Sequence, residues 1–354
     1  MITDPKFFVG RKDELNVITT RMVSGQPVSI NIVGKRRIGK SSLLYHFFQT
    51  YEQRVQNSDR YIVIYVDLLD ALCHNEVGFY QKIVQELLNR PKVKAQTGLT
   101  NVLNGRTFDR LTFSAAMKEW KRQGVLPVLC LDEFGSLLKH QTEFNNDFFD
   151  NLHSLMNNCV LMLVIASHET LDTYRQHHQL TSSFFNVGQV LRLGDLTEAE
   201  AKELVSLPAR MGVPAALSTD EQRLAKEWAE NHPLLLQLAC TFLWEARQQG
   251  QYISWAKQRF IQEARRVPKS RFHPRQWRRP LRFVFWDLPL SLGNLTKSIG
   301  GGVNEVIAWG IGIFLMIAII LAIFGLIPGS QVYVLFKKFL CSTLSGALGK
   351  WCDV

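Results

Sequence analysis

The sequence predicts an α/β fold: a parallel five-stranded sheet with helices on both faces, followed by a small all-helical lid and a C-terminal transmembrane helix. Most of its apolar, β-branched runs are continuous rather than alternating, as in strands that are covered on both faces. Helical patterns separate these runs, and the order strand, helix, strand implies right-handed crossovers between parallel strands. After Leu196 the patterns are helical only, until a long apolar run near the C-terminus.

The same patterns place the individual elements and divide the chain. The expected strands are 28–33, 61–67, 128–132, 159–166 and 189–193, and the helices between them are 41–51, 76–88, 107–123 and 146–156. The lid helices are expected at 197–207, 219–231, 233–249 and 254–266, the first opening with a capping box from Thr197 to Glu200. The predicted parts are a sheet domain at 1–196, a lid at 197–266, a basic linker at 267–302, a transmembrane helix at 303–328 and a short tail at 329–354.

Charge and cysteine content narrow the class of protein. The formal net charge is +10, and the eight basic residues from Arg265 to Arg282 have no acidic residue among them. Such a run attracts the phosphates of nucleic acid or of anionic lipid. None of the six cysteines belongs to a CxxC pair, and the N-terminus has no apolar signal-peptide core. We therefore expect the sheet domain to be reduced and cytosolic, without a zinc site.

The most specific motif lies between the first strand and the first helix. The segment from Gly34 to Ser41 fits GxxxxGK[ST], the phosphate-binding loop of P-loop NTPases. Its backbone N–H groups are expected to wrap the phosphates, Lys40 to add charge at the β and γ positions, and the Ser41 hydroxyl to ligate Mg²⁺. The alternative is a glycine-containing turn with a chance lysine. The residues assigned to phosphate binding are Gly34, Lys35, Arg36, Arg37, Ile38, Gly39, Lys40, Ser41 and Ser42.

Polar residues end two further strands. The run 128–131 is followed by Asp132 and Glu133, whose side chains point to opposite sides. Asp132 is expected to hold the Mg²⁺ shell and Glu133 to polarise the attacking water as general base. The alternative is an acidic pair that only caps a turn. Ser167 and His168 end the next strand, which should lie between the phosphate-loop strand and the Asp132 strand, so either of them is a candidate for sensing the γ-phosphate, against an ordinary strand end with a solvated histidine.

Together these motifs resemble the AAA+/STAND superfamily, and in particular the bacterial and archaeal ATPases near the Orc/Cdc6 branch. The resemblance covers roughly residues 5–250 and implies ATP as the nucleotide, since no guanine-specific NKxD motif follows the strands. It implies that the box Phe8, Val9, Gly10 and Arg11 packs beside the adenine. Asn231-His232-Pro233 is similar to the Gly-x-Pro turn of STAND lids, with Asn231 in place of glycine, and Pro233 then approaches the nucleotide; proline is also simply favourable at a first helical position.

The chain departs from that superfamily at two arginine positions. Val187 stands where relatives often carry an arginine before the fifth strand, and His168 stands where STAND proteins often carry another. Arg192 and Arg210 are the remaining candidates for an arginine finger or sensor. The segment after the lid is also too short for the winged helix that commonly follows.

A membrane span is predicted from residues 306–327, which include no charged residue. About 20 residues at 1.5 Å each cross a hydrocarbon core of about 30 Å, and the alternative is a buried hairpin or core helix. Basic residues are denser before the run than after it, so the positive-inside rule keeps the ATPase domain in the cytoplasm and makes the protein single-pass. Adjacency to the span favours lipid over nucleic acid as the partner of the basic linker.

The first hypothesis for function is a membrane-anchored ATPase that hydrolyses Mg-ATP and acts as a nucleotide-dependent switch or assembly factor, with an unidentified protein partner and a possible homo-oligomeric state as further expectations. One alternative is a DNA-associated ATPase of the Orc/Cdc6 or transposition type, which the +10 charge would suit. The other is a nucleotide-binding scaffold with little turnover. The carboxylates at 132 and 133 argue against the scaffold, because hydrolysis needs both.

Overall fold

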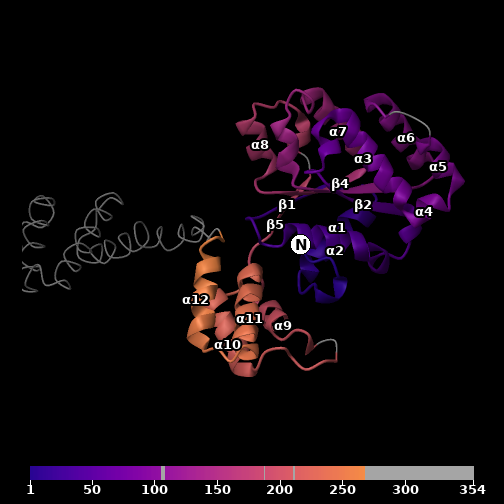
Figure 1. Cartoon of the computed structure of the whole chain (residues 1–354). Coiled ribbons are helices and arrows are strands. Elements are labelled where there is room, and N and C mark those ends of the chain that lie inside the picture. Colours follow the sequence, from indigo (N-terminus) through magenta and orange to yellow (C-terminus); the bar gives the residue numbers. More distant parts are fainter. Residues whose placement is uncertain (105–107, 187, 210–211, 268–354) are drawn as a thin grey trace, which may run out of the picture. The chain divides into compact units, whose positions relative to one another are not determined.

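The computed structural model describes residues 1–104, 108–186, 188–209 and 212–267. Within them a five-stranded parallel sheet runs in the order β2-β3-β4-β1-β5 (Figure 1). Its strands are β1 Ile30–Val33, β2 Tyr61–Asp67, β3 Leu126–Asp132, β4 Met162–Ser167 and β5 Gln189–Arg192. Because all strands are parallel, their carboxyl ends meet at one edge, and β4 lies between β1 and β3 as expected.

The two faces of the sheet are built from alternate residues of the same strands. Along β3, Val128 and Cys130 belong to one buried core and Leu129 and Leu131 to the other. The first core packs against α1 Lys12–Val23 and α2 Lys40–Thr50, and the second against α3 Glu76–Asn89, α6 Arg110–Arg122 and α7 Asn146–Asn157 (Figure 1). Burial of both faces explains why the strands read as continuous apolar runs.

Shorter helices complete the sheet domain. They are α4 Pro91–Lys94, α5 Thr97–Leu103 and α8 Leu171–His177. Short 3₁₀ segments occupy Pro5–Phe7, Tyr51–Arg54, Ser58–Arg60, Ala71–His74, Phe134–Lys139 and Ser183–Asn186.

The lid is a bundle of four described helices with a core of its own. They are α9 Glu198–Val205, α10 Thr219–Ala229, α11 Pro233–Gln248 and α12 Ile253–Ala264. Capping boxes open α9 at Thr197 and α10 at Ser218, and each satisfies two backbone N–H groups that the helix leaves unpaired. Val9, from the N-terminal segment of the sheet domain, is buried in the lid core.

The sheet and its two helical layers confirm the predicted α/β fold. Helix α6 begins at Arg110, after the expected residue 107, because Asp109 forms its capping box with Thr112. Helices α1, α4, α5 and α8 had not been predicted. The predicted transmembrane helix, the tail and almost all of the basic linker lie outside the described residues. In the part of the chain that the structure describes, no helix has the length and apolar character needed to cross a membrane.

Candidate functional site

The phosphate loop leaves β1 and enters α2 through two residues with left-handed backbone. These are Arg37, with φ of 66°, and Gly39, with φ of 101°, which stands directly before α2. Gly34 permits a close approach, because a Cβ there would lie 2.9 Å from the carbonyl oxygen of Leu193. No described side chain caps the start of α2, so its first N–H groups and the positive end of the helix dipole face the loop.

Lys40 is held inside the loop by two backbone carbonyls. Its Nζ donates to the oxygen of Gly34 at 2.7 Å and to that of Lys35 at 2.9 Å. The side chain is buried, and burial is the largest cause that lowers the pKa of Lys40, against the opposing charges of Glu133 and Asp132. The loop therefore presents a cation that is fixed in direction and poorly solvated, which strengthens its interaction with an anion.

His168 lies between Lys40 and Glu133. Its Nδ1 is 3.3 Å from the Lys40 Nζ, and its Nε2 is 3.4 Å from the Glu133 Oε2. An ammonium only donates and a carboxylate only accepts, so a neutral imidazole with its proton on Nε2 satisfies both neighbours. Burial, and next the charge of Lys40, lower the pKa of His168, which favours this neutral form.

The two carboxylates at the end of β3 have different surroundings. Asp132 is buried; its Oδ2 accepts from the Tyr65 hydroxyl at 2.7 Å, and its Oδ1 accepts from the Glu133 N–H at 2.9 Å. Burial, and next the charge of Asp132, raise the pKa of Tyr65, so this tyrosine remains a donor. Glu133 has left-handed backbone with φ of 54°, and its side chain lines the cavity described below.

Ser167 is occupied by the structure of the sheet. Its hydroxyl accepts from the Asn31 amide at 2.7 Å and donates to the carbonyl oxygen of Glu169 at 2.6 Å. Asn31 is buried on β1 and also accepts from the N–H of Leu171. Of the two candidates at the end of β4, His168 lines the cavity and Ser167 supports the turn beneath it.

The N-terminal box ties the sheet domain to the lid. Phe8 stacks on His46 at 4.0 Å between ring centroids. Gly10 and Arg11 both have left-handed backbone, and the Arg11 N–H donates to the Glu200 carboxylate of α9. The Arg11 guanidinium donates to the carbonyl oxygen of Gly194 at 2.6 Å and pairs with Glu14 at 3.1 Å. Arg11 therefore fixes the connection between β5 and the lid.

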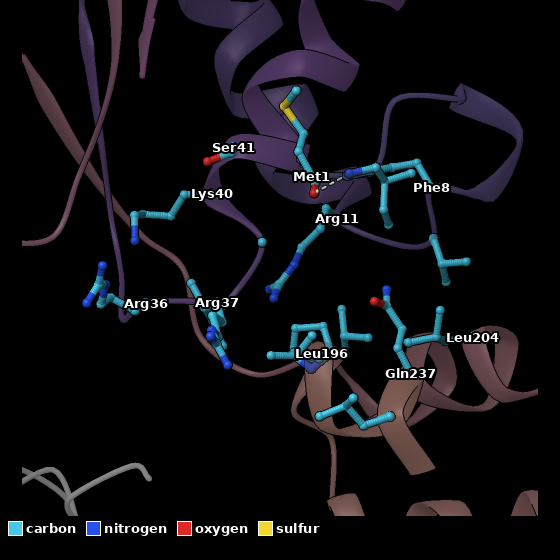
Figure 2. A pocket seen from close by; sticks show the side chains of 18 of the residues that line it. Met1, Phe8, Arg11, Arg36, Arg37, Lys40, Ser41, Leu196, Leu204 and Gln237 are labelled. Atoms are coloured by element: carbon cyan, nitrogen blue, oxygen red, sulfur yellow. Dashed lines mark hydrogen bonds between the residues drawn. The ribbon is translucent and has the colours of Figure 1, made fainter. Parts of the chain in front are cut away.

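A cavity of about 620 Å³ joins these groups (Figure 2). Its lining combines loop and strand-end polar groups with apolar side chains of the box and the lid, including Leu196, Leu204 and Leu238. The predicted site residues that line it are Phe8, Val9, Arg11, Arg36, Arg37, Ile38, Gly39, Lys40, Ser41, Ser42, Glu133, His168 and Pro233. Gly10, Gly34, Lys35, Asp132 and Ser167 are not among the lining residues.

Several residues of the site were not found by sequence reasoning. Tyr65 orients Asp132, Glu200 holds the N-terminal box, and Gln237 of α11 lines the cavity. The N–H of Ile2 donates to the Ser42 hydroxyl at 3.0 Å, so that hydroxyl already has a partner. These contacts join residues far apart in the chain, and only the capping box around Glu200 left a local pattern.

The donor set fits a nucleotide triphosphate with a magnesium ion. One end of the cavity is cationic and carries free helix N–H groups, as phosphates require, and the other is apolar, as a purine requires. Ser41 in the lining and Asp132 outside it carry oxygen atoms of the kind that Mg²⁺ prefers. Neither candidate for an arginine finger or sensor is found among the described residues that line the cavity. Arg192 is exposed on β5, opposite Val33, and does not line the cavity. Arg210 lies outside the described residues, as does Val187, the position where relatives often carry an arginine.

Comparison with known proteins places the chain in a family. Residues 1–259 match the family described as AAA-like domain. The chain belongs to the AAA-like domain family. This match covers the sheet, the N-terminal box and nearly all of the lid, so the site described above lies wholly within the family's domain. A search of curated proteins finds no match to the AAA-like chain.

One solved structure shares the fold of this AAA-like protein at low sequence identity, and two others match it more weakly. The Walker-type ATPase PABY2304 of Pyrococcus abyssi matches with a TM-score of 0.54 and 17% identity, over 82% of this chain and 81% of the other. The ORC2 protein of Aeropyrum pernix, in ADPNP–ADP complexes, matches with a TM-score of 0.49 and 14% identity, over 96% and 89%. The ORC1 protein of Aeropyrum pernix, in complex with DNA, matches with a TM-score of 0.47 and 14% identity, over 95% and 78%.

Proposed function

We propose that this AAA-like protein binds Mg-ATP between its sheet domain and its lid, hydrolyses it, and acts as a nucleotide-dependent switch or assembly factor of the STAND type. One observation supports this most directly: a single cavity is lined by the phosphate loop, by Glu133 and His168 at the strand ends, and by Pro233 of the lid. A ligand that fills this cavity would contact every element that the switch must couple.

Each polar group has a part in holding and hydrolysing the nucleotide. The loop N–H groups and Lys40 bind the phosphates. Phe8, Val9 and Pro233 line the apolar end of the cavity, where the base would lie. Ser41 and Asp132 would hold a magnesium ion, which would neutralise part of the negative charge of the phosphates. Glu133 is half-buried and lines the cavity, whereas Asp132 is buried, so Glu133 is the carboxylate able to orient water.

The reaction is an in-line displacement at the γ-phosphorus. The water oxygen bonds to the γ-phosphorus as the bond to the bridging oxygen breaks, and the products are ADP and inorganic phosphate. The Glu133 carboxylate accepts the water proton and passes it to solvent. His168 keeps the carboxylate near the loop through its contact at 3.4 Å.

The connection between β5 and α9 is the hinge through which the nucleotide would act. The N–H of Leu196 donates to the carbonyl oxygen of Asn231 at 2.9 Å, and Arg11 holds the carbonyls of Gly194 and Asp195. A triphosphate that binds loop and lid together shifts the lid toward the position that makes both sets of contacts. Loss of the γ-phosphate weakens the preference for this lid position. A protein partner would bind one of the two lid positions more tightly than the other.

Binding and turnover test the proposal separately. The full chain, purified in detergent, is titrated with ATP in the presence of Mg²⁺, and phosphate release is followed. We expect binding by the unmodified protein, loss of binding in Lys40→Ala, and binding without turnover in Glu133→Gln. ATP binding that survives in Lys40→Ala would refute the site. Equal, near-zero turnover of wild type and Glu133→Gln would instead support the scaffold reading.

Membrane anchoring is the second part of the proposal. The uncharged run 306–327 and the basic residues that precede it support a single-pass protein with its ATPase domain in the cytoplasm and with the linker on anionic lipid. A salt-dependent shift of duplex DNA by the protein would favour the DNA-associated alternative. Cross-linking of the Glu133→Gln form in solubilised membranes would identify a homo-oligomer or a protein partner.

A further inference from the structure

Two arginines of the phosphate loop, Arg36 and Arg37, are exposed and line the cavity, and Arg36 is the one whose charge acts on Lys40. Arg36 lines the cavity beside Lys40, Glu133 and His168. Its side chain is exposed, and among the described residues no hydrogen bond or ion pair holds its guanidinium. Lys40, by contrast, has two carbonyl partners, and a free guanidinium offers five donors to an incoming anion.

Arg36 lies at the cationic end of the cavity, with Lys40, rather than at the apolar end. Figure 2 shows the Arg36 guanidinium and the Lys40 amine pointing into the same end of the cavity. The positive charge of Arg36 lowers the pKa of both Lys40 and His168. Lys40 contacts His168, and His168 contacts Glu133, the proposed base, so Arg36 acts electrostatically on the place where hydrolysis would occur.

The other arginines near the site differ from Arg36 in position or in their partners. The Arg11 guanidinium pairs with Glu14 and donates to the carbonyl oxygen of Gly194. Arg192 is exposed on the edge strand β5 and does not line the cavity. Burial, and next the charge of Lys40, lower the pKa of His168 at the end of β4, which favours its neutral form. Arg37 also lines the cavity, but Arg36 is the loop arginine whose charge acts on both Lys40 and His168.

We propose that Arg36 is a catalytic residue that contacts the terminal phosphate of ATP from within the same chain and neutralises the charge that grows on the leaving and equatorial oxygens during hydrolysis. The inference rests on the proposed ATPase function and assigns one more residue to it. A planar guanidinium binds two phosphate oxygens at once, which a lysine cannot reproduce. The chain would then need no arginine from a second copy for this step.

The experiment compares Arg36→Gln, Arg36→Lys and the unmodified full-length protein. Arg36→Gln should lower kcat about 100-fold, as loss of one preorganised charge donor does, and should lower the ratio of ATP to ADP affinity about tenfold. ADP affinity alone should change little, because the contact is to the γ-phosphate. Arg36→Lys should recover part of the binding ratio and less of kcat.

Arg122→Gln is the matched control for net charge. Arg122 is exposed on α6, outside the cavity, with its charge shared with Glu119, so this variant should keep wild-type kcat and affinity ratio. Equal losses of ATP and ADP affinity in Arg36→Gln would overturn the proposal, since they indicate only a general attractive field. Unchanged kcat in Arg36→Gln would overturn it as well. Failure of the unmodified protein to bind ATP would remove the proposed function itself, a result distinct from these.

Discussion

His168 is placed where its protonation state controls two other residues. With Lys40 at 3.3 Å on one side and Glu133 at 3.4 Å on the other, the neutral ring bridges a cation and an anion. A protonated ring would repel Lys40 and hold Glu133 as an ion pair, away from water. The lowered pKa of His168, caused first by burial and then by Lys40, keeps the productive form at neutral pH.

The first prediction concerns the acid side of the pH–rate profile. ATP hydrolysis should decline as pH falls through the lowered pKa of His168, and His168→Gln should flatten that decline while lowering kcat at pH 7.5. Folding stability should change in the same direction. As pH falls, His168 of the unfolded chain is protonated first, near pH 6.5, because its pKa is not lowered there. The contribution of His168 to the free energy of unfolding is therefore fully present above that pH and is lost as pH falls through the pKa of the folded state. Steady-state rates and urea midpoints from pH 5 to 8 measure both. An identical acid limb in His168→Gln would contradict this.

The second prediction concerns the orientation of Asp132. Tyr65→Phe removes the hydroxyl that donates to Asp132 at 2.7 Å and keeps the ring packed against Tyr45. A hydrogen bond to a charged group contributes about 1.5–3 kcal/mol. We expect a loss of stability of that size and a higher Mg²⁺ concentration for half-maximal ATPase activity. Urea unfolding and a Mg²⁺ titration test it, with Tyr45→Phe as the control. A Mg²⁺ requirement equal to wild type would show that Tyr65 does not position the ligand.

The residues found from sequence and those missed differ in one physical respect. Lys40, Ser41 and Glu133 stand in local patterns whose chemistry depends on spacing along one segment. Tyr65 and Asn31 act across the sheet, from strands separated by many residues, and each is a polar residue within an apolar run. The pattern of a single strand does not predict which polar residue forms a hydrogen bond to another strand, because such bonds depend on strand order and register.

At the scale of elements, the N-terminal box and α9 form one joint. Glu200 accepts from the Arg11 N–H and also closes the capping box with Thr197. Gly10 lies against the same carboxylate, and a Cβ at Gly10 would overlap it. Glu200, which the sequence identified as part of a helix cap, therefore also connects the lid to the N-terminal box.

The third prediction tests this joint with a double-mutant cycle. Gly10→Ala should cost at least about 2 kcal/mol, since an alanine with φ of 71° is strained and the added carbon displaces Glu200. It should also weaken ATP binding, because the lid loses its anchor. In Gly10→Ala/Glu200→Ala the overlap is gone, so the combined loss should be smaller than the sum of the single losses. Strict additivity in denaturant unfolding would argue against the joint.

The fourth prediction concerns α7 and the aromatic core on its face of the sheet. Phe148 is fully buried and meets Phe79, Phe144 and Phe149 edge to face. Phe148→Ala should reduce the free energy of unfolding by about 3–5 kcal/mol, as expected for a large buried ring. Leu111→Ala on α6 is the control, because Leu111 is 79% exposed and should change stability by less than about 0.5 kcal/mol. Denaturant unfolding monitored by circular dichroism compares them.

The elements that sequence reasoning found are those with strong periodicity. The five strands and the helices α2, α3, α7, α10 and α11 were placed to within a few residues. Helix α1 was read only as part of a motif, and α5 and α8 are too short, at seven residues each, to show a helical period against the loops around them. Packing against the larger elements stabilises such short helices, and packing is not visible along the chain.

At the scale of the whole molecule, two cores meet at one ligand cavity. The sheet domain buries one apolar cluster on each face of its sheet, the lid buries a third, and Val9 is the N-terminal residue that belongs to the lid core. A nucleotide that contacts both stabilises the arrangement by an amount set by its concentration, about 2.7 kcal/mol at 100 times Kd. Coupling between nucleotide and lid therefore needs no contact beyond those of the cavity and the hinge.

The fifth prediction is that the run 306–327 anchors the protein in a membrane. The protein should sediment with membranes and resist extraction by salt and alkali, whereas Leu315→Arg/Ile319→Arg should not, because each arginine at a span centre costs about 2.5–3.5 kcal/mol. Lys118→Arg/Lys121→Arg is the control, since it also changes two residues to arginine but within the sheet domain. Sealed vesicles should leave the ATPase domain open to protease on the cytoplasmic side. Release of the unmodified protein by salt alone would instead mean that the basic residues from Arg265 to Arg282 hold it by charge.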